Sequence, residues 1–284
     1  MVRDALCAAH GWTPEAVELV VIRTTGDRVQ DRALAEIGGK ALWTKELDRA
    51  LLAGEVDACV HSMKDVETLR PDSIAIAAAL PRADVRDRLI GAASLDALPR
   101  GATVGTSSPR RQAQLLRRRP DLKIVLFRGN VDTRLAKLAG GEVNATLLAA
   151  AGLDRLGRGD VGSPVSLDVM LPAPAQGVVG VEVRADDGDA CARAAAIDHS
   201  PTHACIRTER ALLAALRADC HSPVAALARC EGDTLQLAAE LLAEDGGAHV
   251  QGRIEGGPGE PLGERLAADL LARAPERVRR LFAA

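Results

Sequence analysis

Arginine side chains follow three predicted strands near the middle of the chain. The predicted strands are residues 102–105, 123–127 and 145–150. The arginines that follow them are Arg110 and Arg111, Arg128 and Arg134, and Arg155. Each apolar run precedes helix-like sequence, which predicts parallel strands joined by crossover helices. Ligands of such sheets bind beyond the carboxyl ends of the strands, where these guanidiniums would suit several carboxylates or phosphates.

The helices after these strands carry capping signals that favour the same kind of ligand. Ser108 is placed to cap the first helix, with Pro109 at its first position, and Asn130 to cap the second. Helix amino termini attract anions. A single arginine after a strand is ordinarily a surface residue, and we expect the arginine run 117–119 to be a solvated helix end. Three successive strand ends with arginine favour an anion-binding site, but this pattern alone names no reaction.

The composition is typical of a soluble globular protein and argues against several other classes. The 284 residues, 47% hydrophobic and 26% charged, are enough for two or three domains. Aromatic residues make up 1%, so the core must be aliphatic and stacking platforms for single-stranded nucleic acid are missing. The net charge of -3 also argues against nucleic-acid binding, and no apolar run is long enough to span a membrane. Six scattered cysteines without a CxxC pair predict reduced thiols in the cytoplasm.

The order of the predicted strands and helices divides the chain into three domains. Domain 1 comprises residues 1–80 and 177–197, domain 2 residues 81–176, and domain 3 residues 198–284. In domain 1, strands are predicted over 17–22, 56–60, 74–79 and 178–183, and helices over 2–9 and 41–52. Residues 81–88 and 172–177 are predicted to be two adjacent linkers that connect domains 1 and 2. The cleft between paired domains of this kind is a common ligand site.

Domain 3 is predicted to be a small α+β unit. Thr202 caps a long helix that ends at Leu216, two antiparallel strands cover 235–242 and 249–254, and an amphipathic helix covers 261–282. The predicted fold class is therefore α/β, with two doubly wound domains followed by one small α+β domain.

Asp65 follows a predicted strand, in a position suited to chemistry. Lys64 lies beside it and His61 upstream, so the carboxylate can donate, accept or stabilise a positive charge. An aspartate that caps the next turn is an equally good interpretation. Cys220 lies in a polar loop between an aspartate and a histidine, where a cysteine is a candidate nucleophile or attachment point.

A third candidate site has a loosely metal-like spacing. It consists of His199, His203 and Cys205. A helix is predicted to begin at Thr202, and the set lacks a fourth ligand, so we predict no metal site.

Taken together, the motifs of this chain resemble the porphobilinogen deaminase family almost from end to end. The strings that carry the resemblance are TTGDR at 24–28, GGKALWTKEL at 38–47, VHSMKD at 60–65, GTSSPRRQAQL at 105–115, RGNVDTRL at 128–135, AAAGLDRLG at 149–157, LPAPAQG at 171–177 and DCHSPVAA at 219–226. VHSMKD and GTSSPRR are highly specific in this order.

The resemblance implies a transferase of tetrapyrrole biosynthesis, the route to haem and other porphyrins. Four porphobilinogen molecules are condensed head to tail, with release of ammonia, into the linear hydroxymethylbilane. A dipyrromethane cofactor is attached by a thioether to the loop cysteine, here Cys220, and Asp65 matches the catalytic aspartate. The family fold has two periplasmic-binding-protein-like domains and a small third domain that carries the cysteine. We expect a cytoplasmic monomer that binds neither nucleic acid nor membranes.

The resemblance also implies binding roles for individual residues. Cofactor contacts are implied for Lys64, Asp27, Thr106, Ser107, Ser108, Arg110, Arg111, Arg128, Gly129 and Arg134. Substrate contacts are implied for Arg128, Arg134, Arg155, Lys40 and Gln176. Residues 30–40 match a loop thought to cover the site. These roles agree with the residue pattern, because each pyrrole carries two carboxylates and the growing chain is a polyanion.

The chain departs from the family pattern in two places. The family begins with a strand and turn of the type GTRxSxLA, whereas this sequence starts within the helix that follows, so we expect a shortened chain of low stability and weak activity. Ala218 and Asp219 stand where two glycines are expected before the cysteine. The competing hypotheses are an impaired deaminase and a non-catalytic small-anion-binding protein, which would need neither Asp65 nor Cys220.

Overall fold

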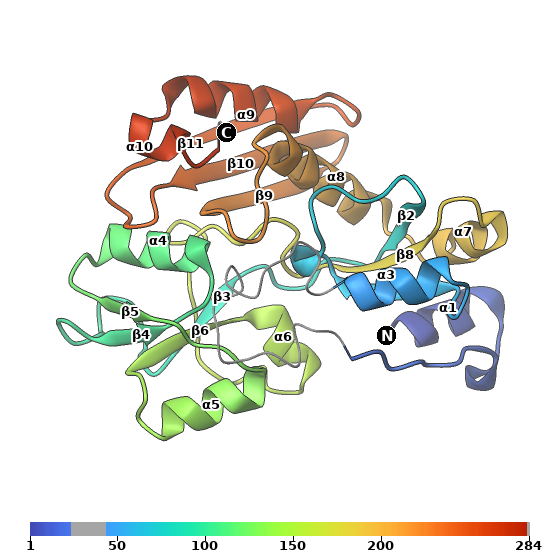
Figure 1. Cartoon of the computed structure of the whole chain (residues 1–284), viewed down its shortest axis with the longest axis horizontal. Coiled ribbons are helices and arrows are strands. Elements are labelled where there is room, and N and C mark those ends of the chain that lie inside the picture. Colours follow the sequence, from blue (N-terminus) through green and yellow to red (C-terminus); the bar gives the residue numbers. More distant parts are fainter. Residues whose placement is uncertain (24–43, 283–284) are drawn as a thin grey trace.

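The structure is a computed structural model that describes residues 1–23 and 44–282. The strands in these ranges form three sheets (Figure 1). We call each sheet, with the helices packed on it, domain 1, domain 2 or domain 3. The first two are α/β and the third is α+β, which confirms the predicted fold class. Within the same ranges, none of the helices combines the length and the hydropathy needed to cross a bilayer.

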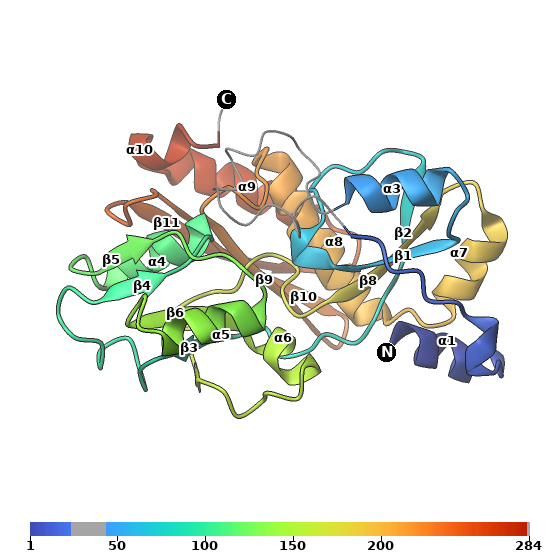
Figure 2. The same cartoon turned by 60° about the horizontal axis from the view of Figure 1, so that its bottom comes forward.

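Domain 1 is a three-stranded sheet with helices on both faces. The strand order is β1 (Ala58–Ser62), β8 (Val179–Arg184) and β2 (Ile74–Ala79). The central β8 is antiparallel to both neighbours. It follows the strands of domain 2 in the sequence, so this sheet contains segments from both sides of domain 2. One face is covered by α3 (Lys45–Leu52), and the other by α7 (Gly188–Ala195) and α1 (Val2–His10), as Figure 2 shows.

The predicted strand over residues 17–22 is wrong. These residues have no regular structure, and Leu19, Val20 and Val21 are 64%, 54% and 88% exposed. A strand is stable only when a neighbour pairs with its backbone groups, and no described strand pairs with this run. The apolar pattern is present, but its pairing partner is not among the described strands.

Domain 2 contains a five-stranded mixed sheet. Its strand order is β5 (Lys123–Val125), β4 (Thr103–Gly105), β6 (Ala145–Ala149), β3 (Asp87–Ile90) and β7 (Ser163–Pro164). β4 is parallel to β5 and to the central β6, while β3 is antiparallel to β6 and β7. The helices that follow β4, β5 and β6 are α4 (Pro109–Arg118), α5 (Val131–Ala139) and α6 (Ala150–Arg155). The three predicted strand–helix units are confirmed, whereas β3 replaces part of the predicted linker.

The predicted caps of domain 2 are present. The side chain of Ser108 accepts a hydrogen bond from the backbone N–H of Arg111 at 3.4 Å. Asn130 accepts one from the N–H of Thr133 at 2.8 Å. The two helices therefore begin where the sequence predicts, directly after the carboxyl ends of their strands.

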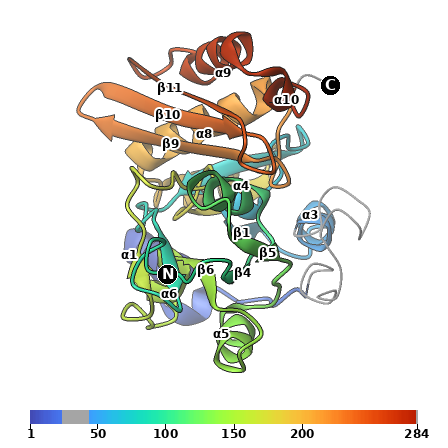
Figure 3. The same cartoon turned by 90° about the vertical axis from the view of Figure 1, so that its left-hand side faces the viewer.

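Domain 3 is an antiparallel sheet with helices on one face. The strand order is β11 (His249–Gly256), β10 (Thr234–Leu242) and β9 (Val224–Glu231). Its core packs the sheet against α8 (Ser200–Ala215), α9 (Leu262–Arg273) and α10 (Glu276–Arg279). The sequence analysis does not predict β9. The other face of the sheet lies against α4 of domain 2 (Figure 3), where Gln114 donates to Glu240 at 3.1 Å.

Three details of the helices differ from the predictions. The cap of α8 is His199, which accepts from the N–H of Thr202, so Thr202 lies in the first turn. The predicted final helix is divided into α9 and α10, because Pro275 cannot continue a helix and also disfavours helical backbone before it. The arginine run at the end of α4 is not simply solvated: Arg117 pairs with Glu240, and Arg119 pairs with Asp121.

The two linkers between domains 1 and 2 lie side by side. The N–H of Ala83 donates to the carbonyl of Gly177 at 3.1 Å. Gly177 has φ +89°, and a Cβ there would lie 2.7 Å from the Ala83 oxygen, so only glycine fits this crossing. Beside this crossing, Arg82 binds the buried Glu209 of α8 at 2.6 Å. This ion pair joins domain 3 to the linkers between domains 1 and 2.

Candidate active site

The catalytic candidate Asp65 lies in a short turn that is anchored in the core. β1 leads into the 3₁₀ turn η3 (Met63–Asp65). Met63 is buried, its N–H donates to the Val178 carbonyl at 3.0 Å, and a Cβ on Gly180 would lie 2.1 Å from its sulfur. The close fit of Met63 over Gly180 fixes the turn, while Asp65 remains exposed.

Lys64 lies beside Asp65 and faces domain 2. Burial lowers the pKa of the Lys64 ammonium, and the charge of Asp65 opposes this shift. Arg111 and Arg110 lower the same pKa, and Asp87 raises it. These influences place the Lys64 ammonium within electrostatic reach of the arginine-bearing end of domain 2.

Arg110 and Arg111 share one buried carboxylate, that of Asp87. Nη2 of Arg110 donates to Oδ2 of Asp87 at 2.9 Å, and Nη2 of Arg111 donates to Oδ1 at 2.7 Å. The amide of Gln176 donates to the same Oδ1 at 3.0 Å. Burial opposes ionisation of Asp87, but the two guanidiniums outweigh it and hold the pKa of Asp87 well below its usual range. Asp87 is not among the site residues predicted from the sequence. The only feature of the sequence that could have indicated it is an acidic residue at the start of a short apolar strand.

Arg110 and Arg111 also carry N–H donors that these contacts do not use. Nε of Arg110 and Nε of Arg111 are buried and have no hydrogen-bond partner among the residues that the structure describes, and the same holds for Oε1 of Gln176. Buried donors without partners are costly, and two cations share a single anion here. This end of domain 2 is therefore suited to an additional anionic acceptor.

Arg134, Arg128 and Gly129 follow β5 on the same side of domain 2. Nε of Arg134 donates to the Gly129 carbonyl at 2.9 Å. Gly129 has φ +121°, and a Cβ there would lie 2.6 Å from Thr133, so the turn requires glycine. Burial lowers the pKa of Arg134 to about 10, with Arg111 and Arg128 as further causes and Asp65 opposing them.

The remaining described candidates of domain 2 lie around this group. Arg155 donates from Nη2 to the Gly177 carbonyl at 2.8 Å, which places it at the linkers, and burial lowers its pKa. Thr106 is buried and accepts from the N–H of Ser108 at 3.2 Å, and Ser107 lies between them, half-buried. Asp27 and Lys40 lie outside the described residues.

Cys220 lies in a tight polar turn of domain 3. Asp219 accepts from the N–H of His221 at 2.8 Å, and Ser222 accepts from the N–H of Asp219 at 3.1 Å. Cys220 is exposed. Partial desolvation by the surrounding protein nevertheless raises the pKa of the thiol to about 12, and the carboxylates of Asp219 and Asp65 contribute to the shift. At neutral pH the group is therefore a thiol.

The structure thus brings together candidates from three domains. The charge of Asp65 in domain 1 acts on the thiol of Cys220 in domain 3 and on the guanidinium of Arg134 in domain 2. By contrast, His199, His203 and Cys205 form no metal cluster, since no group of three or more potential ligands is found in the part of the chain that the structure describes.

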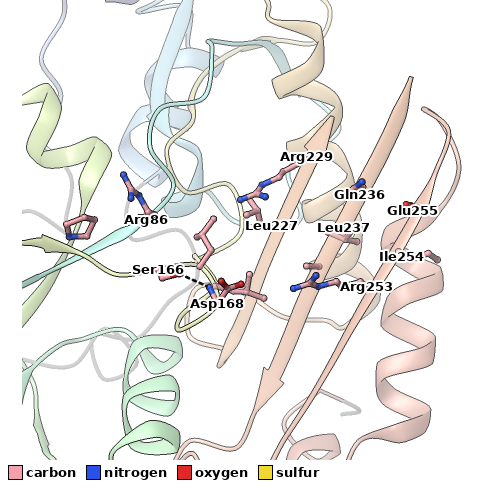
Figure 4. A pocket seen from close by; sticks show the side chains of 14 residues that line it. Arg86, Ser166, Asp168, Leu227, Arg229, Gln236, Leu237, Arg253, Ile254 and Glu255 are labelled. Carbon is pink, nitrogen blue, oxygen red and sulfur yellow. Dashed lines mark hydrogen bonds between the residues drawn. The ribbon is translucent and has the colours of Figure 1, made fainter. Parts of the chain in front are cut away.

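A separate cavity of about 860 Å³ lies between domains 2 and 3. Figure 4 shows side chains of β9, β10 and β11, among them Arg229 and Arg253, opposite Ser166, Asp168 and Arg86. Its lining includes neither Asp65 nor Cys220. The candidate active site is therefore distinct from this cavity.

The fold and the site define an α/β protein that places a carboxylate, a cysteine and an excess of arginines around a place for a polyanionic ligand. Residues 1–192 match the family model described as porphobilinogen deaminase, dipyromethane cofactor binding domain, and residues 203–272 match that of the porphobilinogen deaminase C-terminal domain. The chain therefore belongs to the porphobilinogen deaminase family.

Individual relatives agree with this assignment. The porphobilinogen deaminase of Sphingopyxis alaskensis is 56% identical over 292 residues, which cover 100% of this chain and 91% of that one. The enzyme of Paracoccus denitrificans is 51% identical, with coverage of 96% and 89%. Among solved structures, a substrate-binding domain of a putative amino acid ABC transporter from Streptococcus pneumoniae gives a TM-score of 0.40 at 15% identity, with coverage of 68% and 78%. The predicted family and enzyme class, a transferase of the hydroxymethylbilane synthase type, are confirmed over the non-catalytic alternative.

Proposed function

We propose that this chain carries out the porphobilinogen deaminase reaction at the site formed by Asp65, Cys220 and the arginines of domain 2. In that reaction four porphobilinogen molecules are joined head to tail with release of four ammonia molecules, and one water molecule adds to the last unit to give hydroxymethylbilane. The observation that supports this site most strongly is the position of Asp65, whose charge acts on both Cys220 and Arg134. A binding protein for small anions would need the arginines but neither Asp65 nor Cys220.

We propose Cys220 as the attachment point of the dipyrromethane cofactor. Its sulfur lies in an exposed turn and near the catalytic candidate, whereas Cys59 and Cys205 are buried. The residues that would hold the carboxylates and pyrrole rings are Lys64, Thr106, Ser107, Ser108, Arg110, Arg111, Arg128, Gly129 and Arg134, together with Asp27. When bound, the cofactor supplies the terminal pyrrole carbon to which the first substrate is joined.

Arg110 and Arg111 fit such a group because these two guanidiniums share the single carboxylate of Asp87. Each pyrrole unit carries an acetate and a propionate, and the buried Nε donors of Arg110 and Arg111 lack acceptors. Arg128, Arg134, Arg155, Lys40 and Gln176 are proposed to contact incoming substrate. A guanidinium binds a carboxylate through two parallel hydrogen bonds, which orients the ring as well as attracting it.

Asp65 is proposed to stabilise positive charge on the substrate. Loss of ammonia from porphobilinogen leaves a cationic pyrrole, and a fixed carboxylate near the ring N–H lowers the energy of that cation. The same oxygen atoms can accept and return the proton that moves when the new carbon–carbon bond forms. The anchored Met63 turn holds the carboxylate in place while this charge develops.

The experiment that tests the site is an intact-mass measurement of the denatured protein. The unsubstituted chain should carry an added mass of two pyrrole units, and Cys220→Ser should carry none. Cys230→Ser is the matched control, because Cys230 is another domain 3 cysteine with a half-buried side chain and should leave the adduct in place. An adduct that persists in Cys220→Ser, or that maps by peptide mass to another cysteine, would contradict the assignment.

We further propose a monomer that works in the cytoplasm. All six cysteines are free, as expected where thiols are kept reduced. Light scattering during size-exclusion chromatography should give the mass of one chain, and a mass of two chains would contradict the monomer.

A further inference from the structure

The segment that follows Asp65 is held from both sides by polar contacts. On the side of domain 1, Arg70 binds Glu182 of β8 at 2.9 Å and Asp48 of α3 at 2.5 Å. Burial disfavours the charge on Arg70, but the hydrogen bonds to these carboxylates outweigh it and raise the pKa of Arg70. The far end of the segment is therefore fixed to the sheet that carries Asp65.

The near end of the segment is held by domain 3. Nη2 of Arg210, on α8, donates to the carbonyl of Glu67 at 2.6 Å and to that of Thr68 at 3.0 Å. The hydroxyl of Thr68 donates to the carbonyl of Ala218 at 2.7 Å. Thr68 stands three residues after Asp65, and Ala218 stands two residues before Cys220.

The two bonds of Arg210 come from one face of α8. Ile206 and Arg210 are four residues apart, so they project from the same side of the helix. Ile206 is fully buried in a cluster with Met63 and Val66, the two residues that flank the pair Lys64 and Asp65. The apolar contact holds α8 near the catalytic turn, whereas the directional hydrogen bonds of Arg210 and Thr68 set how the turn is oriented.

We propose that Thr68 and Arg210 are positioning residues that set the place of Asp65 relative to Cys220. The inference rests on the proposed roles of Asp65 and Cys220. These two groups come from different domains and are far apart in the sequence, so only tertiary contacts fix their separation. Thr68 provides a direct route, a single hydrogen bond that joins the segment after Asp65 to the turn before Cys220.

The expected consequence lies in turnover rather than in substrate affinity. Neither Thr68 nor Arg210 is among the proposed substrate ligands, so their loss should leave the arginines of domain 2 unchanged. A carboxylate displaced by a fraction of an ångström, however, stabilises a developing cation less well, and small misplacements of reacting groups are costly in rate. The value of kcat should therefore fall while KM is kept.

The test compares Thr68→Val with Thr68→Ser in the full chain. Valine keeps the shape of the side chain and removes the hydroxyl, whereas serine keeps the hydroxyl. The cofactor-loaded fraction is first measured by intact mass, and kcat and KM for porphobilinogen are then given per loaded molecule. We expect kcat of Thr68→Val to fall about tenfold with KM within about twofold, and that of Thr68→Ser to stay within about twofold of the unsubstituted chain.

Two further variants separate positioning from general stability. Thr208→Val is the matched control, because the Thr208 hydroxyl donates to the Ala204 carbonyl at 2.9 Å, within α8 itself. It should leave kcat unchanged. Arg210→Met removes both bonds to the segment by a different substitution and should lower kcat in the same direction as Thr68→Val.

Normal kcat per loaded molecule in both Thr68→Val and Arg210→Met would overturn the inference, even if their melting temperatures fall. A loss in Thr208→Val as large as that in Thr68→Val would overturn it as well. Failure of the proposed function has a different signature: the adduct would persist in Cys220→Ser, or a folded and loaded Asp65→Asn would keep its full turnover.

Discussion

Two groups of buried arginines in this molecule have opposite surroundings. Arg70 and Arg82 are matched by anions: Arg70 reaches Glu182, Asp48 and Glu67, and Arg82 is bound by both oxygens of Glu209. Arg110 and Arg111 share the single carboxylate of Asp87 and keep buried Nε donors without partners. The first group is satisfied within the protein, and the second is not.

The electrostatics follow this division. For Arg70, burial is outweighed by the hydrogen bonds that its guanidinium donates to carboxylates, and its pKa is raised. For Arg110, burial lowers the pKa, Asp87 opposes this shift, and the charge of Arg111 adds to it. Charged groups that remain buried without enough counter-charge cost free energy, which an anionic ligand can recover on binding. The comparison indicates which arginines hold the domains together and which are arranged for a polycarboxylate.

The largest effect is expected from breaking a matched pair. Glu209 is fully buried, binds Arg82, and also accepts from the N–H groups of Ala175 and Ala228. Glu209→Ala would leave the Arg82 guanidinium buried without its anion, which typically costs about 3–5 kcal/mol in the free energy of unfolding. Urea unfolding followed by circular dichroism measures this loss.

Glu260→Ala is the control for that measurement, since its pair with Arg265 is about half exposed on both sides. We expect a loss of about 1 kcal/mol or less for an exposed pair. Equal losses for the two variants would contradict the structural role given to Glu209.

The next effect concerns the catalytic candidate. Asp65→Asn keeps the shape of the side chain and removes the charge that should stabilise the cationic substrate. We expect the melting temperature to stay close to that of the unsubstituted chain and turnover to fall by about 10²–10³. Asp72→Asn is the control, because Asp72 is an exposed residue after the same segment. Near-normal turnover in a folded, cofactor-loaded Asp65→Asn protein would remove Asp65 from the mechanism.

The features of the fold that could be predicted from the sequence are those that depend on residues close together in the chain. The strand–helix units of domain 2 and the caps Ser108 and Asn130 depend on neighbours within a few residues, and the structure confirms them. The strand over 17–22 is wrong because pairing is a long-range property that an apolar run does not encode.

The matched pairs of the molecule could not be predicted for the same reason. From the sequence, Glu209 looks like an ordinary polar residue of a helix. It is buried because segments remote in the sequence, which contain Ala175 and Ala228, pack against it. Asp87 reads as part of a charged linker, and only the sheet shows that it faces two arginines. The candidate site residues lie in motifs that the sequence shows directly, whereas the residues that balance or orient their charges do not.

The smallest effect is a difference in acid stability, which sharpens the comparison at Asp87. Burial opposes its ionisation, but Arg110 and Arg111 hold its pKa below the ordinary value of 3.8. Between the folded and unfolded pKa values the unfolded chain binds more protons, so stability rises with pH. The contribution of Asp87 is therefore fully present above pH 3.8 and is lost as the pH falls toward the folded pKa.

The measurement is urea unfolding of the unsubstituted chain and of Asp87→Asn at several pH values from 5 down to 3. Asp87→Asn should be the less stable at pH 5, and the gap in unfolding free energy should narrow below pH 4 by at most about 1.4 kcal/mol per pH unit, the slope for one proton. Asp245→Asn removes a carboxylate of an exposed pair with Arg277, so its gap from the unsubstituted chain should be small throughout. A gap for Asp87→Asn that stays constant or widens in acid would mean that Arg110 and Arg111 do not hold this carboxylate ionised. In that case Arg110 and Arg111 would not share an ionised carboxylate at all. Their difference from Arg70 and Arg82 would then be larger than the structure indicates.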